Sequence, residues 1–154
     1  MKLQTSRFGE IDVEMEKLLT FAQGIPGFED KHTFIMLQPD ENIPFSFMQS
    51  VEDGDLSFLV TDPFLYFPDY QFDLPEGVQE EMNLQKPEDI MIRSIVSIHP
   101  DTQEFALNLL APVIVNAKDK IGKQVILHHS SYKTKHPIKP QERNQEEKTE
   151  LKGV

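Results

Sequence analysis

The sequence predicts a mainly all-β, single-domain fold in which short antiparallel strands form a sandwich or a barrel, with one or two short helices. Apolar and polar residues alternate over many short segments, which is typical of half-buried strands. Turn-forming pairs such as Pro39-Asp40, Asp53-Gly54 and Asp62-Pro63 separate those segments. The length of 154 residues suits one domain with one core.

The expected strands follow from this alternation. Ile11 and Val13 alternate with carboxylates, and apolar residues occupy every second position from Phe105 to Val115. Pro112 cannot donate a ladder hydrogen bond, so we expect the second run to break into two strands there. The full set of expected strands is 10–14, 33–37, 45–48, 57–61, 90–98, 105–115 and 124–128, with 116–123 as a hairpin connection.

One short helix of two to three turns is expected to begin at Leu74-Pro75-Glu76. Pro75 stands near the first helical position, and Glu76 places an acid in the first turn. Leu74, Val78 and Met82 fall on one face at a spacing of four, so this face is expected to be buried.

The end of the chain has a different composition. From Ile138 onward the residues are polar, with almost nothing to bury. We therefore expect a folded domain over residues 1–137 and a mobile polar tail over residues 138–154.

Composition excludes several classes of protein. The chain has no cysteine, so disulfides, thiolate nucleophiles and Cys-based metal sites are excluded, and a reducing compartment is expected. No apolar run reaches the roughly 18 residues that a membrane-spanning helix needs, and the N-terminal residues lack the apolar core of a secretory signal. We expect a cytoplasmic protein that makes no membrane contact.

The charge is strongly negative and unevenly distributed. The net charge is −11, and residues 133–154 carry six basic and four acidic side chains, so the first 132 residues carry −13. Between Val51 and Ile90 there are eleven carboxylates and one cation, Lys86. Such a surface repels phosphate backbones and attracts basic partners, so direct nucleic-acid binding is disfavoured, although acidity also serves solubility alone.

The residues give no pattern for catalysis. There is no phosphate-binding glycine motif, and carboxylates are too abundant for any pair to be informative. His128, His129 and His136 are the only histidine cluster, but adjacent strand residues point to opposite faces. We therefore expect no catalytic residue, no metal site and no cofactor.

Two segments could serve either the core or a binding surface. Gly24-Ile25-Pro26-Gly27-Phe28 is either a turn that presents Ile25 and Phe28 or a corner capped by a buried Phe28. Residues 62–72 hold five aromatics in nine positions, bracketed by prolines and carboxylates. They are either a crossover that covers the core or an exposed anchor patch, with Tyr66 and Tyr70 best suited to half-exposed positions.

Several motifs in one order resemble the flagellar assembly factor FliW family. They are Phe8-Gly9-Glu10-Ile11, Gly24-Ile25-Pro26-Gly27-Phe28-Glu29, Pro44-Phe45 with Gln49-Ser50, Val60-Thr61-Asp62-Pro63 with Asp69-Tyr70, and Leu107-Asn108 followed by 111–116 and Gly122-Lys123-Gln124. Each motif is weak by itself, but in register they cover the chain from its first residue to about His136.

The resemblance implies an antiparallel β-barrel-like fold and a protein-binding function without a chemical step. FliW proteins bind the RNA-binding translational repressor CsrA, so that flagellin mRNA is translated, and they also bind flagellin. Unexported flagellin takes FliW and thereby frees CsrA. A flagellin chaperone with no role in translation, and an acidic β-barrel enzyme, are the alternatives. We expect a monomer when the protein is alone.

Candidate contact residues follow from this resemblance. A cationic RNA-binding repressor suits the acidic turn with Glu52, Asp53 and Asp55. Flagellin termini are amphipathic and need an apolar groove, so the flagellin candidates lie in the aromatic segment: Phe64, Tyr66, Phe67 and Tyr70.

Overall fold

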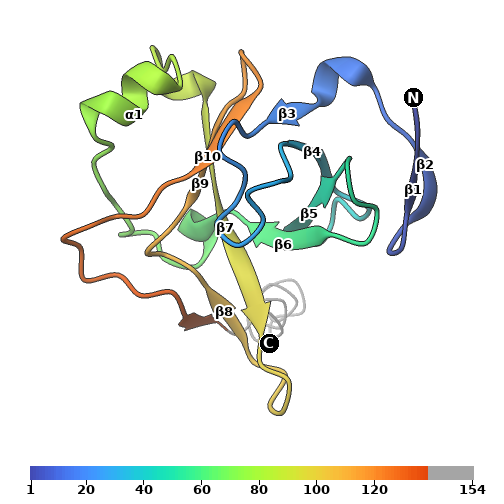
Figure 1. The fold of residues 1–154 in the computed structure, drawn as a ribbon. Coiled ribbons are helices and arrows are strands. Elements are labelled where there is room, and N and C mark those ends of the chain that lie inside the picture. Colours follow the sequence, from blue (N-terminus) through green and yellow to red (C-terminus); the bar gives the residue numbers. More distant parts are fainter. Residues whose placement is uncertain (139–154) are drawn as a thin grey trace.

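The computed structural model describes residues 1–138, and the predicted mainly all-β fold is confirmed (Figure 1). In chain order, with η for a 3-10 helix, the elements are β1 Lys2–Thr5, β2 Gly9–Asp12, η1 Met15–Lys17, β3 Leu19–Thr20, β4 Thr33–Leu37, β5 Phe45–Ser50, β6 Ser57–Thr61, η2 Pro63–Leu65, α1 Glu76–Glu81, η3 Pro87–Asp89, β7 Ile90–Ile98, β8 Phe105–Leu107, β9 Val113–Asn116, β10 Ile121–Gln124 and β11 His136–Ile138. Of the expected tail, only Ile138 is described, and it is buried in β11; the remainder lies outside the described residues.

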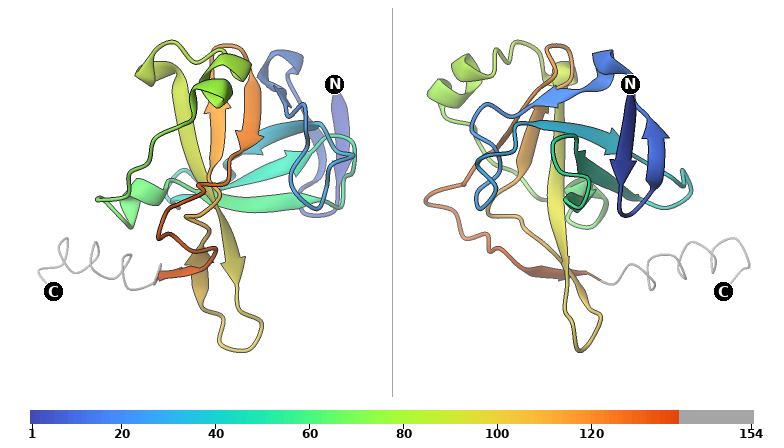
Figure 2. Two further views of the ribbon diagram at one scale, coloured as in Figure 1. Left: turned by 60° about the vertical axis from the view of Figure 1, so that its left-hand side comes forward. Right: turned by 45° about the vertical axis from the view of Figure 1, so that its right-hand side comes forward.

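Seven strands close into a ring. Hydrogen-bonded neighbours follow the order β7-β6-β5-β4-β3-β10-β9, and β9 pairs back onto β7. These pairings are antiparallel except for one parallel bridge between Thr20 and Ile121. Closure leaves the ring strands without a free edge. Figure 2 shows β8 and β11 extending beyond the ring, at the end of the molecule opposite α1.

Strand β7 joins the ring to this extension. Its first half, from Ile90 to Arg93, pairs with β9, and its last residues pair with β8. Ser94 and Ile95 in the middle pair with β6. This nine-residue strand therefore pairs with three partners, which explains its length.

Alternate residues of the ring strands face two separate cores. Phe34, Met48, Val60, Val113 and Val115 come from ring strands and form the inner core. The outer core lies between the ring and the segment that carries α1, and it holds Leu107, Leu109, Ile114, Met82 and Tyr70. Successive residues such as Val113 and Ile114 thus belong to different cores, as the period of two requires.

One glycine is required by the packing of the inner core. A Cβ atom at Gly122 in β10 would lie 2.3 Å from Cζ of Phe21, which is fully buried. The ring of Phe21 therefore occupies the space beside β10 that a side chain would otherwise take.

The structure bears out most predicted elements. Strands β4 and β6 have the predicted bounds, Pro112 lies in the break between β8 and β9, and α1 begins directly after Pro75. With six residues, α1 is shorter than the predicted two to three turns. Met82 is buried on the apolar helix face, and Leu74 and Val78 pack against the outer core.

The strand predicted at 124–128 is wrong. Strand β10 begins earlier than predicted, at Ile121 after a tight turn, and its ladder with β9 ends at Gln124. Val125 and Leu127 are still buried, and their backbone N–H groups donate to Pro112 O at 2.9 Å and to Leu110 O at 2.8 Å. An irregular segment here reproduces the alternating burial of a strand.

The glycine turn combines both readings. Ile25 is 2% exposed, so it is a core residue and is not presented to solvent. Phe28 is 39% exposed and packs edge-on against Phe58 at 5.3 Å between ring centroids. The expectation that a buried Phe28 caps the corner is therefore wrong.

Candidate protein-docking surface

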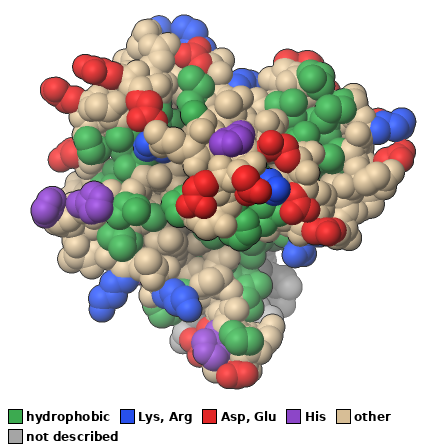
Figure 3. All heavy atoms as spheres, in the orientation of Figure 1, with side chains coloured by type: hydrophobic (Ala, Val, Ile, Leu, Met, Phe, Trp, Pro, Cys, Tyr) green, Lys and Arg blue, Asp and Glu red, His purple; other side chains and the backbone are tan. Residues whose placement is uncertain are grey.

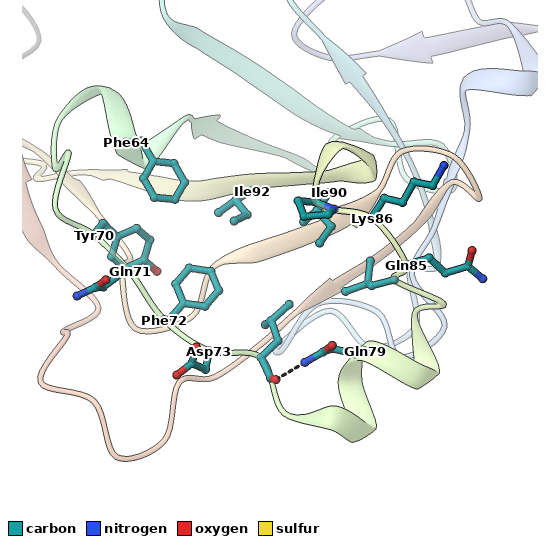
Figure 4. Close-up of a pocket in the computed structure, with 13 residues that line it drawn as sticks. Phe64, Tyr70, Gln71, Phe72, Asp73, Gln79, Gln85, Lys86, Ile90 and Ile92 are labelled. Atoms are coloured by element: carbon teal, nitrogen blue, oxygen red, sulfur yellow. Dashed lines mark hydrogen bonds between the residues drawn. The ribbon is translucent and has the colours of Figure 1, made fainter.

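An apolar groove of about 470 Å³ lies beside the aromatic segment. Its walls come from residues 64–74, from the end of α1 with the turn that follows it, and from the start of β7 (Figure 4). The apolar and aromatic side chains that line it are Phe64, Tyr70, Phe72, Leu74, Leu84, Pro87, Ile90 and Ile92. Figure 4 shows Phe64 and Phe72 of the aromatic segment and Ile92 of β7 pointing toward the same space.

Phe64 is the exposed large hydrophobic side chain of this groove. It is 37% exposed, although η2 is fixed at its N-terminus by the Asp62 carboxylate, which accepts a hydrogen bond from the Phe64 backbone N–H at 2.9 Å. Its ring contacts that of Tyr70 at 5.7 Å. A rigid, half-exposed aromatic ring above an apolar floor is a typical anchor for a partner's apolar side chain.

Tyr70 supports the groove from below. It is 4% exposed, and its hydroxyl donates to Leu109 O at 2.7 Å. Burial raises the pKa of Tyr70, so the hydroxyl remains a protonated donor. The expectation that Tyr70 is half exposed is wrong, because Tyr132, in the loop that follows β10, packs edge-on against it with 4.7 Å between ring centroids.

The other two aromatic candidates face away from the groove. Tyr66 stacks on Phe45 at 6.3 Å between ring centroids, and Phe67 lies edge-on to His136 at 5.7 Å. Both are half-buried and pack against the outer core. The segment is thus core and surface at once: Phe64 lines the groove, while its neighbours attach the segment to the barrel.

Most polar side chains around the groove are carboxylates or amides. Asp73, Gln79, Gln85 and Lys86 line it together with the apolar residues. Gln79 is fixed by a hydrogen bond from Nε2 to Leu74 O at 2.8 Å. Further exposed carboxylates lie nearby in the sequence, at Asp69, Glu76, Glu80, Glu81 and Glu88. Figure 3 shows Asp and Glu side chains beside hydrophobic ones over the displayed face.

The acidic turn connects β5 to β6 and is held by its own carboxylates. Glu52 Oε1 accepts hydrogen bonds from the backbone N–H groups of His32 and of Thr33, the latter at 2.9 Å. The bond from His32 is the main cause that lowers the pKa of Glu52. Glu52 therefore stays ionised and also fixes the start of β4.

The two aspartates of this turn have local structural roles as well. Asp53 Oδ1 accepts from the Asp55 backbone N–H at 3.0 Å, and the Asp55 carboxylate accepts from the Ser6 hydroxyl. Glu52 and Asp55 are exposed, and Asp53 is partly buried. The turn therefore presents carboxylates in fixed positions, which lowers the ordering entropy that a partner's binding must offset.

Two candidate surfaces thus lie at opposite ends of one strand. The acidic turn precedes β6 and η2 follows it, so the five residues of β6 separate them. At about 3.4 Å per residue, this strand spans roughly 17 Å.

The histidines do not form a metal site within residues 1–138. No group of three His, Asp or Glu side chains in this part of the chain is placed to hold a metal ion. The His128 and His129 rings lie 6.5 Å apart, and His136 Nε2 accepts from the Lys133 backbone N–H at 2.8 Å. Burial, followed by the charge of Lys133, lowers the pKa of His136, so its ring is neutral.

The aromatic segment in the sequence indicates only one of the two walls of the groove. Leu84, Pro87, Ile90 and Ile92 form its second wall. Ile90 and Ile92 lie near Phe64 because β7 contacts η2. The apolar alternation of β7 shows that Ile90 and Ile92 share a face. It does not show which segment covers that face.

The comparisons with known proteins decide the family. The FliW protein family matches residues 2–138, which is the described part of the chain apart from Met1. The chain belongs to the FliW family. Among residues 1–138 of this FliW-family chain, no helix is long and apolar enough to span a membrane.

Named relatives and a solved structure agree with this assignment. The chain is 42% identical over 139 residues to the flagellar assembly factor FliW of Alkaliphilus metalliredigens, covering 90% of this chain and 86% of that protein. It is 39% identical over 138 residues to FliW of Bacillus subtilis, covering 90% and 96%. A crystal structure of the flagellar assembly factor FliW superposes with a TM-score of 0.83 at 35% identity, over 92% of this chain and 99% of that one.

Proposed function

We propose that this FliW-family chain is a cytoplasmic, protein-binding regulator of flagellar assembly. It sequesters the translational repressor CsrA so that flagellin mRNA is translated, and flagellin displaces CsrA by binding in its turn. The protein works as a monomer, without cofactor or chemical step. The observation that carries the proposal is the combination of family membership with two prepared surfaces, one acidic and one apolar.

The acidic turn suits CsrA because an RNA-binding protein must carry cationic surface. Carboxylates fixed before binding can steer such a partner and repel RNA from the complex. Affinity for CsrA should therefore fall as ionic strength rises. A dissociation constant that does not change with salt would contradict this electrostatic account.

The acidic turn is tested by removing its charge and keeping its hydrogen-bond acceptors. Glu52→Gln, Asp53→Asn and Asp55→Asn together replace each carboxylate by a neutral amide. The remaining amide oxygen can still accept the hydrogen bonds of the turn. We expect weaker CsrA binding with a slower association rate, because long-range attraction acts mainly on that rate. Reversal to Lys is a poorer test, since it would also disrupt the contacts from Glu52 to β4.

A matched control removes the same charge elsewhere. Glu14, Glu16 and Glu41 are exposed and lie outside the turn, so their joint change to Gln alters the net charge equally. Equal loss of CsrA affinity in both triple variants would show that net charge matters and the turn does not.

The groove suits flagellin because an amphipathic helix can place an apolar side chain against Phe64 and Ile92. Phe64 and Leu65 are both 37% exposed in η2, but only Phe64 lines the groove. Phe64→Ala should weaken flagellin binding, and Leu65→Ala should leave it close to the wild-type value. Equal effects of the two substitutions would exclude the groove as the contact.

Cell-free translation of flagellin mRNA tests the switch as a whole. CsrA should repress translation, the purified chain should restore it, and added flagellin should abolish the restoration. If the chain binds flagellin but never relieves repression, it is a flagellin chaperone and the proposal is wrong.

A further inference from the structure

The loop between β3 and β4 presents an aromatic ring that the proposed function does not use. Ile25 is 2% exposed and anchors this loop in the inner core, whereas Phe28, three residues later, is 39% exposed. Gly24 and Gly27 have positive φ values of 65° and 91°, so the chain turns sharply between the two side chains. The Phe28 backbone N–H donates to Ile25 O at 2.6 Å, and the Glu29 carboxylate accepts from the Gly27 N–H at 3.0 Å. The loop therefore holds Phe28 at the surface in a fixed position.

Two further rings support Phe28 from below. Phe28 lies edge-on to Phe58 of β6, with 5.3 Å between ring centroids, and Phe58 contacts the fully buried Phe34 at 6.1 Å. The exposed ring is thus the outer end of an aromatic stack that begins in the inner core. A ring that is already fixed loses little entropy when a partner covers it, and aromatic rings of this kind are common anchors of protein interfaces.

Carboxylates from two segments lie around this ring. Glu29 and Asp30 follow it directly in the sequence and are exposed. The acidic turn is joined to the same loop, because Glu52 Oε1 accepts hydrogen bonds from the backbone N–H groups of His32 and Thr33. The end of the loop and the acidic turn are therefore neighbours on the surface.

The charges of both segments act on one lysine. Lys31 Nζ lies 3.1 Å from the Asp30 carboxylate. The hydrogen bond with Asp30 is the main cause that raises the pKa of Lys31, and the charges of Asp53 and Glu52 raise it further. Figure 3, drawn in the orientation of Figure 1, shows Asp and Glu side chains beside hydrophobic ones where the β3–β4 loop crosses in front of the ring of strands.

The loop and the turn together form one surface, which we call the aromatic–acidic face. It consists of Phe28, Glu29, Asp30, Glu52, Asp53 and Asp55. Its five carboxylates and the adjacent Lys31 leave a net charge of −4. An apolar centre with a charged rim is the usual arrangement of a binding hot spot, because the rim excludes water from the centre.

We propose that the aromatic–acidic face is the docking surface for CsrA, with Phe28 as its apolar anchor. The inference rests on the proposed function and adds to it the β3–β4 loop. CsrA fits this face because an RNA-binding protein carries cationic surface, which complements the carboxylates on both sides of the ring. A second copy of the chain does not fit, since two such faces would repel each other.

The apolar anchor is tested by comparing Phe28→Ala with Ile98→Ala. Ile98 is 45% exposed at the end of β7 and lies outside the aromatic–acidic face, so its truncation is a matched control. Phe28→Ala should weaken CsrA binding by at least roughly ten-fold, mainly through faster dissociation, and should leave flagellin binding unchanged. Ile98→Ala should bind CsrA as the wild type does. Wild-type affinity of Phe28→Ala for CsrA, or an equal loss of flagellin affinity, overturns the inference.

The carboxylates of the loop should act on a different rate. Glu29→Gln with Asp30→Asn should slow the association of CsrA and reduce its dependence on salt, whereas Phe28→Ala should leave the salt dependence as it is. Glu14→Gln with Glu16→Gln removes the same charge from exposed positions outside the face. Equal slowing in the two double variants would show that only net charge matters, and the loop would then be no part of the docking surface.

Photocrosslinking gives a test that needs no truncated side chain. A photoreactive benzoylphenylalanine is placed at position 28, and in a control protein at position 98. Irradiation of the CsrA complex should couple the two proteins at position 28 and not at position 98. If the complex forms and position 28 does not couple, the inference is wrong while the proposed function stands. If the wild-type chain does not bind CsrA at all, both are wrong.

Discussion

Tyr70 and Tyr132 offer a matched pair for testing how the aromatic segment is held. Tyr70→Phe removes a hydroxyl that donates to Leu109 O at 2.7 Å inside the outer core. Tyr132→Phe removes a hydroxyl that bonds the backbone N–H and C=O of Gln71, both at 3.1 Å, where Gln71 is exposed to water. The two substitutions make the same chemical change, in one case in the core and in the other at the surface.

The expected losses of unfolding free energy depend on whether the backbone groups that bonded each hydroxyl can bond water instead. Without the Tyr70 hydroxyl, the buried Leu109 carbonyl has lost this partner and finds no water in its place, so the free energy of unfolding should fall by about 2 kcal/mol. The Gln71 groups can bond water instead, so Tyr132→Phe should lower it by about 0.5 kcal/mol or less. For a domain of this size, the first change lowers the melting temperature by roughly 4–8 °C.

Urea unfolding followed by circular dichroism measures both values, and equal m-values would show that the compactness of the two states is unchanged. Equal losses in the two variants would refute the assignment of Tyr70 to the core. The same proteins also test function: Tyr70→Phe should keep most of its flagellin affinity, because its hydroxyl points away from the groove toward Leu109.

Two further predictions concern stability. Gly122→Ala should lower the free energy of unfolding by about 1–3 kcal/mol, because the new Cβ would lie 2.3 Å from Phe21. Gly77→Ala in α1, where a Cβ meets nothing within 4 Å, should raise the free energy of unfolding by up to about 1 kcal/mol. Urea unfolding measures both changes. The folded state lowers the pKa of Glu52, so this carboxylate stabilises the fold at a pH above its ordinary pKa of 4.5, and the stabilisation is lost as the pH falls through the lower pKa of the folded state. Glu52→Gln should therefore flatten this part of the plot of unfolding free energy against pH. An unchanged plot would contradict the contact with His32.

The strands that could be predicted are those with their own short run of apolar and β-branched residues between turn signals. The residues Thr33–Leu37 and Ser57–Thr61 are apolar or β-branched for the most part, and their bounds follow from composition alone. By contrast, β3 has two residues and β11 has three, including Pro137. Such strands are defined by the partners that bond them, and their own residues give no periodic signal.

The candidate site shows the same division. The density of aromatic rings marks the segment as important, but an irregular backbone has no period from which to assign inside and outside. Tyr70 is therefore buried while Phe64, six residues earlier, is exposed, and no sequence rule separates them.

The geometry of β6 also predicts how the two proposed partners exclude one another. A standard interface takes about 800 Å² from each protein, which is a patch roughly 30 Å across if it is round. The acidic turn and η2 are separated by β6, which spans roughly 17 Å. Patches of this size centred on the two sites would overlap, so CsrA and flagellin would compete without any change in the shape of the barrel.

Light scattering after size-exclusion chromatography tests this competition. A mixture of the three proteins should give two binary complexes and no ternary one, and the proportion of each should follow the concentrations of the partners. Phe64→Ala should shift the mixture toward the CsrA complex, because it weakens flagellin alone. A stable ternary complex would show that the interfaces are smaller than the standard size or point to different faces of the ring, and displacement would then require coupling through β6.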